Sequence, residues 1–143
     1  MATQILLGSL VLAVCSALHV SFVVAWVYFL NRARDAFNSL MPVRRKSVMI
    51  GGTFAIIVIS HTMQVWFISV CLLWAGAFAR LDDSLYFTMV TYTTLGYGDI
   101  TLGPDHRLFG AMAAVTGLLN FGISTAVLVA VINRLLLVDS ETE

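Results

Sequence analysis

The segment Thr93-Thr94-Leu95-Gly96-Tyr97-Gly98-Asp99 has the composition needed to bind a dehydrated monovalent cation through its backbone. A cation leaves water only where oxygen atoms replace its hydration shell at similar distances, and stacked rings of backbone carbonyls can do so. For these carbonyls to face one axis, the backbone has to alternate between conformations. Glycine reaches positive φ at little cost, so we expect positive φ values at Gly96 and Gly98.

Side chains of the segment add to this backbone site. The Thr94 hydroxyl can serve as the innermost ligand, and the Tyr97 ring would turn outward and hold the carbonyl ring open. One chain has one such segment, so a ring of carbonyls implies a homo-oligomer. The expected cation ligands are Thr94, Leu95, Gly96, Tyr97 and Gly98.

A short helix is expected immediately before the segment. Ser84 to Thr93 contains no Gly or Pro, and Asp82, Asp83 or Ser84 is available as the helix cap. The carboxyl end of this helix would direct partial negative charge below the carbonyl rings, which favours a cation there.

Three apolar stretches indicate a membrane protein. The chain has 143 residues, of which 59% are hydrophobic and only 11% charged. The stretches at about 5–30, 48–78 and 108–138 each reach the roughly 20 residues needed to cross a bilayer. We therefore expect an all-α membrane protein with three transmembrane helices, and a re-entrant helix and loop between the last two.

The charge distribution predicts the orientation. We divide the chain into a peripheral helix (1–30), a basic loop (31–47), a pore domain (48–138) and a short acidic tail (139–143). The basic loop belongs in the cytoplasm by the positive-inside rule, which leaves the amino terminus outside and the carboxyl terminus cytoplasmic. The expected location is the plasma membrane, or the inner membrane of a bacterium. The basic loop either contacts anionic lipids of the inner leaflet or only sets the topology.

The segment, the helix before it and the two flanking spans resemble the pore unit of two-transmembrane bacterial potassium channels, over roughly 48–137, with an extra amino-terminal helix. The resemblance implies a homotetramer with K⁺ as the permeant ligand and no cofactor. It also implies a cavity or gate formed by the last span, with the candidates Gly117, Leu118, Asn120, Phe121, Gly122 and Thr125. Gly117 is either a hinge or a close-packing position, and Asn120 either faces the cavity or bonds a neighbouring helix.

The resemblance is incomplete at the residues expected to support the segment 93–99, which corresponds to the selectivity filter of these channels. Relatives often have paired tryptophans where this chain has Tyr86 and Phe87, and some have a glutamate in place of Val90. Tyr86 can donate a hydrogen bond to Asp99, whereas Phe87 has no donor. Thr91 is a candidate partner for the Tyr97 hydroxyl. The expected filter supports are Tyr86, Thr91, Thr93 and Asp99.

His19 and His61 are costly residues inside membrane spans. Each lies about a dozen residues from the cytoplasmic end of its helix, on the order of 15 to 20 Å, so the two imidazoles are expected to meet at one level. Cys15 shares a face with His19. Three interpretations are open. Cys15, His19 and His61 could form a soft-metal site, or the two histidines could be a proton-sensing pair. Alternatively, they make a hydrogen-bonded contact that docks the first helix to the pore.

Three functions fit these features: a K⁺-selective channel, a weakly selective cation channel, or a non-conducting membrane sensor or modulatory subunit with a vestigial pore. We do not expect an enzyme, because no nucleophile, base and orienting group form a recognisable set outside the spans. The chain has no basic domain for nucleic acid. The expected partners are further copies of the chain, membrane lipid and K⁺.

Overall fold

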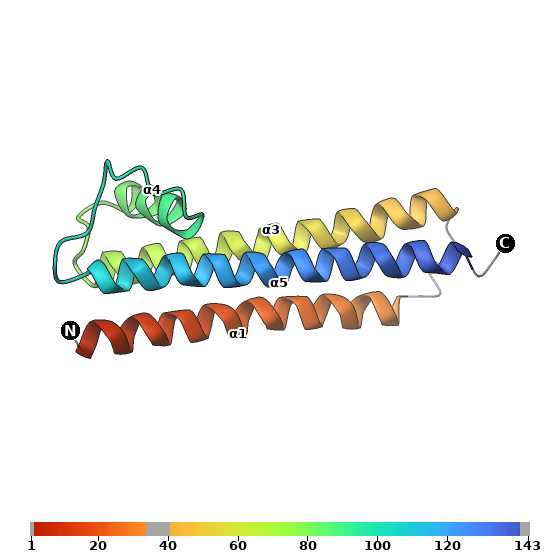
Figure 1. The fold of residues 1–143 in the computed structure, drawn as a ribbon, viewed down its shortest axis with the longest axis horizontal. Helices are drawn as coiled ribbons and strands as arrows, with labels where there is room; N and C mark the ends of the chain where they lie inside the picture. The colour runs from red at the N-terminus through yellow and green to blue at the C-terminus, as the bar shows by residue number, and fades with distance from the viewer. Residues whose placement is uncertain (1, 34–40, 141–143) are drawn as a thin grey trace.

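The computed structural model describes residues 2–33 and 41–140. It contains four helices: α1 (Ala2–Arg32), α3 (Pro42–Trp74), α4 (Leu81–Tyr92) and α5 (Arg107–Ser140). The three long helices run side by side, and α4 lies beside one end of this bundle (Figure 1). No strand occurs in the described residues, and Thr3–Arg32, Val43–Trp74 and Arg107–Leu135 are long and apolar enough to cross a membrane. The predicted all-α membrane fold with three spans is confirmed.

The peripheral helix α1 packs along the whole pore unit. Near its first residues, the Gln4 amide donates to the Pro104 carbonyl at 3.4 Å. Near its last residues, the Arg134 guanidinium donates to the Asn31 side chain, also at 3.4 Å. Helices α1 and α5 are therefore parallel, and α3 runs antiparallel to both (Figure 1). The amino terminus and α4 lie at the same end of the bundle.

Small residues permit the close approach of α1. A Cβ atom at Gly8 would lie 2.3 Å from the Met112 sulfur, and one at Gly52 would lie 2.6 Å from the Trp26 ring. The Trp26 indole also donates to the Thr53 hydroxyl of α3 at 2.9 Å. These contacts follow the usual pattern of membrane helix packing, in which small side chains bring backbones together.

Several element bounds differ from the sequence-based expectation. Helix α3 begins at Pro42. Proline is favoured at the start of a helix because it has no backbone N–H, and an N–H in the first turn has no acceptor within the helix. Residues 42–47 are thus helical and not part of a loop. Helix α5 continues to Ser140, two residues into the expected tail. Residues 34–40 and 141–143 lie outside the described residues. Most of the acidic tail is therefore not described, and the predicted lipid contact of the loop stays a prediction.

The predicted caps of α4 are wrong. The N-cap is Arg80, whose backbone is extended and whose side chain makes no capping bond. Asp82 and Asp83 lie in the first turn instead, where their negative charge suits the positive end of the helix dipole. The buried Ser84 hydroxyl donates to the Ser69 carbonyl of α3 at 2.8 Å, which fixes the start of α4 against the bundle.

Candidate functional site

The segment after α4 alternates in backbone conformation. Thr94, Gly96 and Gly98 have φ values of 60°, 59° and 76°, so that every second residue is left-handed. The predicted positive φ at Gly96 and Gly98 is confirmed. The value at Thr94 was not predicted, because an L-residue is strained there by roughly 1–2 kcal/mol and residue type gives no sign of it. We call Thr93–Asp99 the filter segment.

The first half of the filter segment is held by main-chain bonds from the last turns of α4. The Leu95 and Gly96 N–H groups both donate to the Val90 carbonyl, at 2.9 and 3.2 Å, and the Thr94 N–H donates to the Thr91 carbonyl at 3.0 Å. Because the acceptor at Val90 is a carbonyl, these bonds do not depend on which side chain stands there.

One side-chain bond supports the second half. The Tyr86 hydroxyl donates to the Asp99 carboxylate at 2.6 Å, the contact expected from the sequence. This bond lowers the pKa of Asp99 and raises that of Tyr86. The Thr93 hydroxyl, directly after α4, donates to the Met89 carbonyl of that helix. Within the described residues of one chain, no hydrogen bond joins the Thr91 and Tyr97 hydroxyls, so that pairing stays a prediction.

The filter segment lies on the surface of the single chain. Leu95 is 54% exposed and Tyr97 67% exposed, and all residues from Thr93 to Asp99 are exposed. A carbonyl on such a surface has no opposing oxygen in its own chain. The segment can therefore enclose an ion only when other copies face it.

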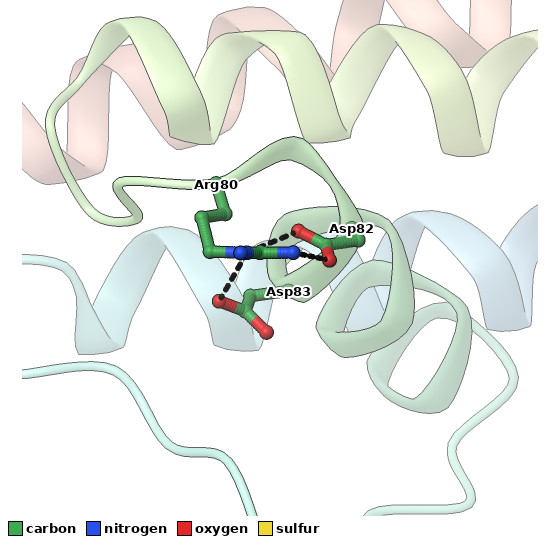
Figure 2. Close-up of polar contacts among 3 residues, drawn as sticks. All are labelled: Arg80, Asp82 and Asp83. Atoms are coloured by element: carbon green, nitrogen blue, oxygen red, sulfur yellow. Dashed lines mark hydrogen bonds and ion pairs between the residues drawn. The ribbon is translucent and has the colours of Figure 1, made fainter.

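A charged cluster lies at the start of α4. The Arg80 guanidinium bonds both carboxylate oxygens of Asp82 and is 4.0 Å from the nearest carboxylate oxygen of Asp83 (Figure 2). The hydrogen bond from Arg80 lowers the pKa of Asp82 to about 2 and raises the pKa of Arg80. The cluster is open to solvent, so it contributes little to stability.

A second polar site lies inside the bundle. Its six side chains, the polar ring, come from all four helices: His19 (α1), Ser60, His61 and Gln64 (α3), Tyr92 (α4) and Ser124 (α5). All are buried except His61, which is partly buried. Hydrogen bonds of 2.8–3.3 Å connect each member to the next and close the ring.

The two imidazoles meet as the sequence predicted, with ring centroids 5.0 Å apart. They do not form the metal site. Within the described residues, no group of three or more His, Cys, Asp or Glu side chains is placed to hold a metal ion. Hydroxyl groups occupy both nitrogens of each imidazole, and Cys15 packs in the apolar core. The structure shows the hydrogen-bonded contact that docks α1 to α3 and α5.

Asn120 points to a helix interface and not to a cavity. It is fully buried, and its amide donates to the Gln64 carbonyl oxygen of α3 at 2.5 Å. Gly117 is a close-packing position, because a Cβ there would lie 1.9 Å from the Tyr92 carbonyl oxygen. The described α5 continues through Gly117 without a break.

The other candidates on α5 are exposed in the single chain: Leu118, Phe121, Gly122 and Thr125. The Phe121 ring nevertheless stacks on the His61 ring at 4.5 Å and meets Tyr92 edge-on at 5.6 Å. Phe121 and Thr125 line an apolar groove of about 640 Å³ between α3, α4 and α5. Whether these residues face a cavity in an assembly stays a prediction.

Sequence reasoning puts Gln64 three residues after His61 on the same helix, but it missed three members of the polar ring: Ser60, Tyr92 and Ser124. A signal existed, since Ser60 precedes Gln64 by four residues and Ser124 follows Asn120 by four. Pairs at this spacing share a helix face, and two polar faces inside apolar spans predict a polar contact between them.

Comparison with known proteins places the chain in a family. Residues 47–134, more than half of the chain, match the family model described as "Ion channel". The chain belongs to this ion channel family. Helix α1 lies entirely before the matched residues of this channel protein. The family and the three apolar helices make it a multi-pass membrane protein.

A 54-residue stretch of this ion channel protein is similar to one relative. It is 37% identical to the potassium voltage-gated channel protein shk-1 of Caenorhabditis elegans, over 37% of this chain and 10% of that protein. The matched stretch is thus about a tenth of the length of that relative. No solved structure matches the chain. Both matches agree with the resemblance to potassium channels seen in the sequence.

Proposed function

We propose that this chain is the pore-forming subunit of a K⁺-selective channel. The carbonyls of Thr94, Leu95, Gly96, Tyr97 and Gly98 and the Thr94 hydroxyl would replace the hydration shell of the ion. The observation that carries the proposal is the left-handed backbone at every second residue from Thr94 to Gly98. This alternation turns successive carbonyls toward one side, as a strand does not.

The helix before the filter segment supports the same function. Helix α4 ends at Tyr92, one residue before the filter segment, so its negative end lies directly at the inner side of the ion path. Irregular backbone within a membrane is stable only where protein or water encloses it. An ion path along the filter segment meets that condition.

The assembly would be a homotetramer. The filter segment is exposed on one chain and needs opposing copies, and four is the number that the resemblance to potassium channels implies. The amino terminus and filter would face the outside and the basic loop the cytoplasm, because Lys and Arg concentrate in that loop. K⁺ is the permeant ligand, and no cofactor is part of the proposal.

Reversal potentials test the selectivity. The purified full chain is incorporated into planar bilayers with K⁺ on one side and Na⁺ on the other. We expect the reversal potential to follow the K⁺ gradient, and native mass spectrometry to give four copies. A reversal potential near zero would instead identify a weakly selective cation channel. Absence of current for both ions, at several voltages, pH values and lipid compositions, would favour the non-conducting sensor.

A further inference from the structure

Helix α1 is outside the matched family region, yet its one histidine is fully buried against the pore unit. We propose that His19 is a positioning residue for the filter, which acts through the polar ring on Tyr92. The peripheral helix would then be a working part of the pore. This inference rests on the proposed channel function.

The hydrogen bonds of the polar ring place His19 between α3 and α5. A neutral imidazole donates one bond and accepts one, and a hydroxyl donates one and accepts up to two. Ser60 can donate to His19 Nδ1, 2.9 Å away, and His19 Nε2–H can donate to Ser124, 3.0 Å away. His19 is thus the only member of the polar ring that joins Ser60 of α3 to Ser124 of α5.

The second half of the polar ring continues in the same direction. Ser124 can donate to His61 Nε2 at 2.8 Å, and His61 Nδ1–H to the Tyr92 hydroxyl at 2.8 Å. Tyr92 donates to the Gln64 carbonyl oxygen at 3.0 Å, and the Gln64 amide returns to Ser60 at 3.3 Å. Each bond of the ring then has one donor and one acceptor, with both imidazoles neutral, and the Ser124 hydroxyl also lies 2.8 Å from the Asn120 carbonyl oxygen of its own helix.

Neutral imidazoles also fit the surroundings. Among the described residues, Tyr92 on α4 is the other titratable group hydrogen-bonded to an imidazole. Asp, Glu, Lys and Arg are absent from 1–31, 47–79, 84–98 and 108–133. An extra proton on the ring would have no counter-charge at this depth, which is costly. The ring therefore serves to hold geometry and not to sense protons.

Tyr92 connects the ring to the filter. It is the last residue of α4 and 1% exposed. Its hydroxyl is held by His61 and Gln64, and its carbonyl lies against Gly117. The same final turns of α4 include Val90, the acceptor for two filter N–H groups. A shift of Tyr92 would displace this acceptor and the carbonyls that follow it.

The test compares three α1 variants of the full chain in bilayers. His19→Leu replaces the imidazole with an apolar side chain and removes both bonds, His19→Gln keeps an acceptor and a donor, and Ser9→Ala is the control. Ser9 also faces α5, through Met112, but lies outside the ring. We expect His19→Leu to lower the channel open probability by about three- to tenfold, the equivalent of one to two lost hydrogen bonds. We expect His19→Gln to recover most of this loss and Ser9→Ala to behave as wild type.

A double-variant cycle separates positioning from general packing. If His19 acts through Tyr92, the double variant His19→Leu/Tyr92→Phe should lower open probability no further than the stronger single variant. Multiplied single effects would overturn the proposal. So would a wild-type open probability in His19→Leu.

Solid-state NMR keeps the inference independent of conduction. In labelled full chain in bilayers, His19→Leu should shift the His61 ring ¹⁵N signals and the Gly96 carbonyl ¹³C signal. An unchanged Gly96 signal would overturn the inference, whether or not wild type conducts. Failure of wild type to pass K⁺ would refute the proposed function alone. If His19→Leu does not fold, Ser60→Ala removes one hydroxyl of the same ring and is expected to give the same two shifts at smaller size.

Discussion

The filter segment and the polar ring solve the same problem in opposite ways. Both place polar groups within a membrane protein, where unpaired groups cost several kcal/mol. The filter segment is exposed on one chain and is held mainly by its own backbone, with one side-chain bond from Tyr86. The polar ring is buried, apart from the partly buried His61, and consists entirely of side chains from four helices.

This difference shows which residues restrain α4, the helix before the filter segment. Behind the filter, Phe87 and Val90 donate no side-chain hydrogen bond, and Phe87 packs in the apolar core. At the carboxyl end of α4, Tyr92 is held by His61 and Gln64. Side-chain hydrogen bonds therefore hold α4 at its last residue, Tyr92, and at its start through Ser84, and Tyr86 adds one bond to the filter segment.

The largest effect is expected where the ring meets the filter helix. Gly117→Ala places a Cβ 1.9 Å from the Tyr92 carbonyl oxygen, and backbone has to move. We expect the free energy of unfolding to fall by about 1–3 kcal/mol or more, as in other overpacked interiors. Thermal unfolding in detergent measures it.

Gly122→Ala is the matched control for Gly117→Ala. It lies on the same helix with no atom within 4 Å of the added Cβ, so we expect no loss and a gain of up to about 1 kcal/mol from helix propensity. Equal stability of the two variants would mean that α5 does not pack tightly against Tyr92. The polar ring would then not be more firmly held than the filter segment.

Gly96→Ala tests the filter segment without touching the ring. Its φ of 59° is strained for alanine by roughly 1–2 kcal/mol. Relief of that strain would rotate the carbonyls away from the ion path. We expect K⁺ selectivity to fall in reversal-potential measurements while the melting temperature changes little. Gly103→Ala, in a loop with open space around it, should retain selectivity. A large loss of melting temperature in Gly96→Ala would show that the two regions are not separable.

The sequence predicted the filter better than the ring, for a physical reason. Positive φ at Gly96 and Gly98 follows from residue type, and the three spans follow from length and hydropathy. The meeting of His19 and His61 follows from helical rise alone. Closure of the ring through Ser124 and Tyr92 depends on how four helices are rotated about their axes, and no local rule fixes those rotations. The positive φ of Thr94 was also not predicted, because its neighbours impose this strained conformation.

Tyr86→Phe tests the one side-chain support of the filter segment. The hydrogen bond from Tyr86 lowers the pKa of Asp99, so its removal should return that pKa toward its ordinary range. A carboxylate with a lowered pKa keeps its negative charge until the pH falls through that lowered pKa. We therefore acidify the solution on the filter side of the membrane and expect the current to fall at a higher pH in Tyr86→Phe than in wild type. Tyr28→Phe, on the exposed face of α1, is the control, and identical acid profiles would remove Tyr86 from the filter support.

The smallest effect is expected at the charged cluster. The pKa of Asp82 is lowered to about 2 by Arg80, against an ordinary value of about 4. The bond to Arg80 thus favours the folded state above about pH 4, and this contribution disappears as the pH falls toward about 2. In wild type the melting temperature should decline slightly across this window, and Arg80→Gln should flatten that decline because Asp82 then titrates alike in both states. Since the pair is open to solvent, the change should also shrink in high salt. A salt-independent decline would mean that buried groups, and not this cluster, cause the acid sensitivity of the outer end of α4.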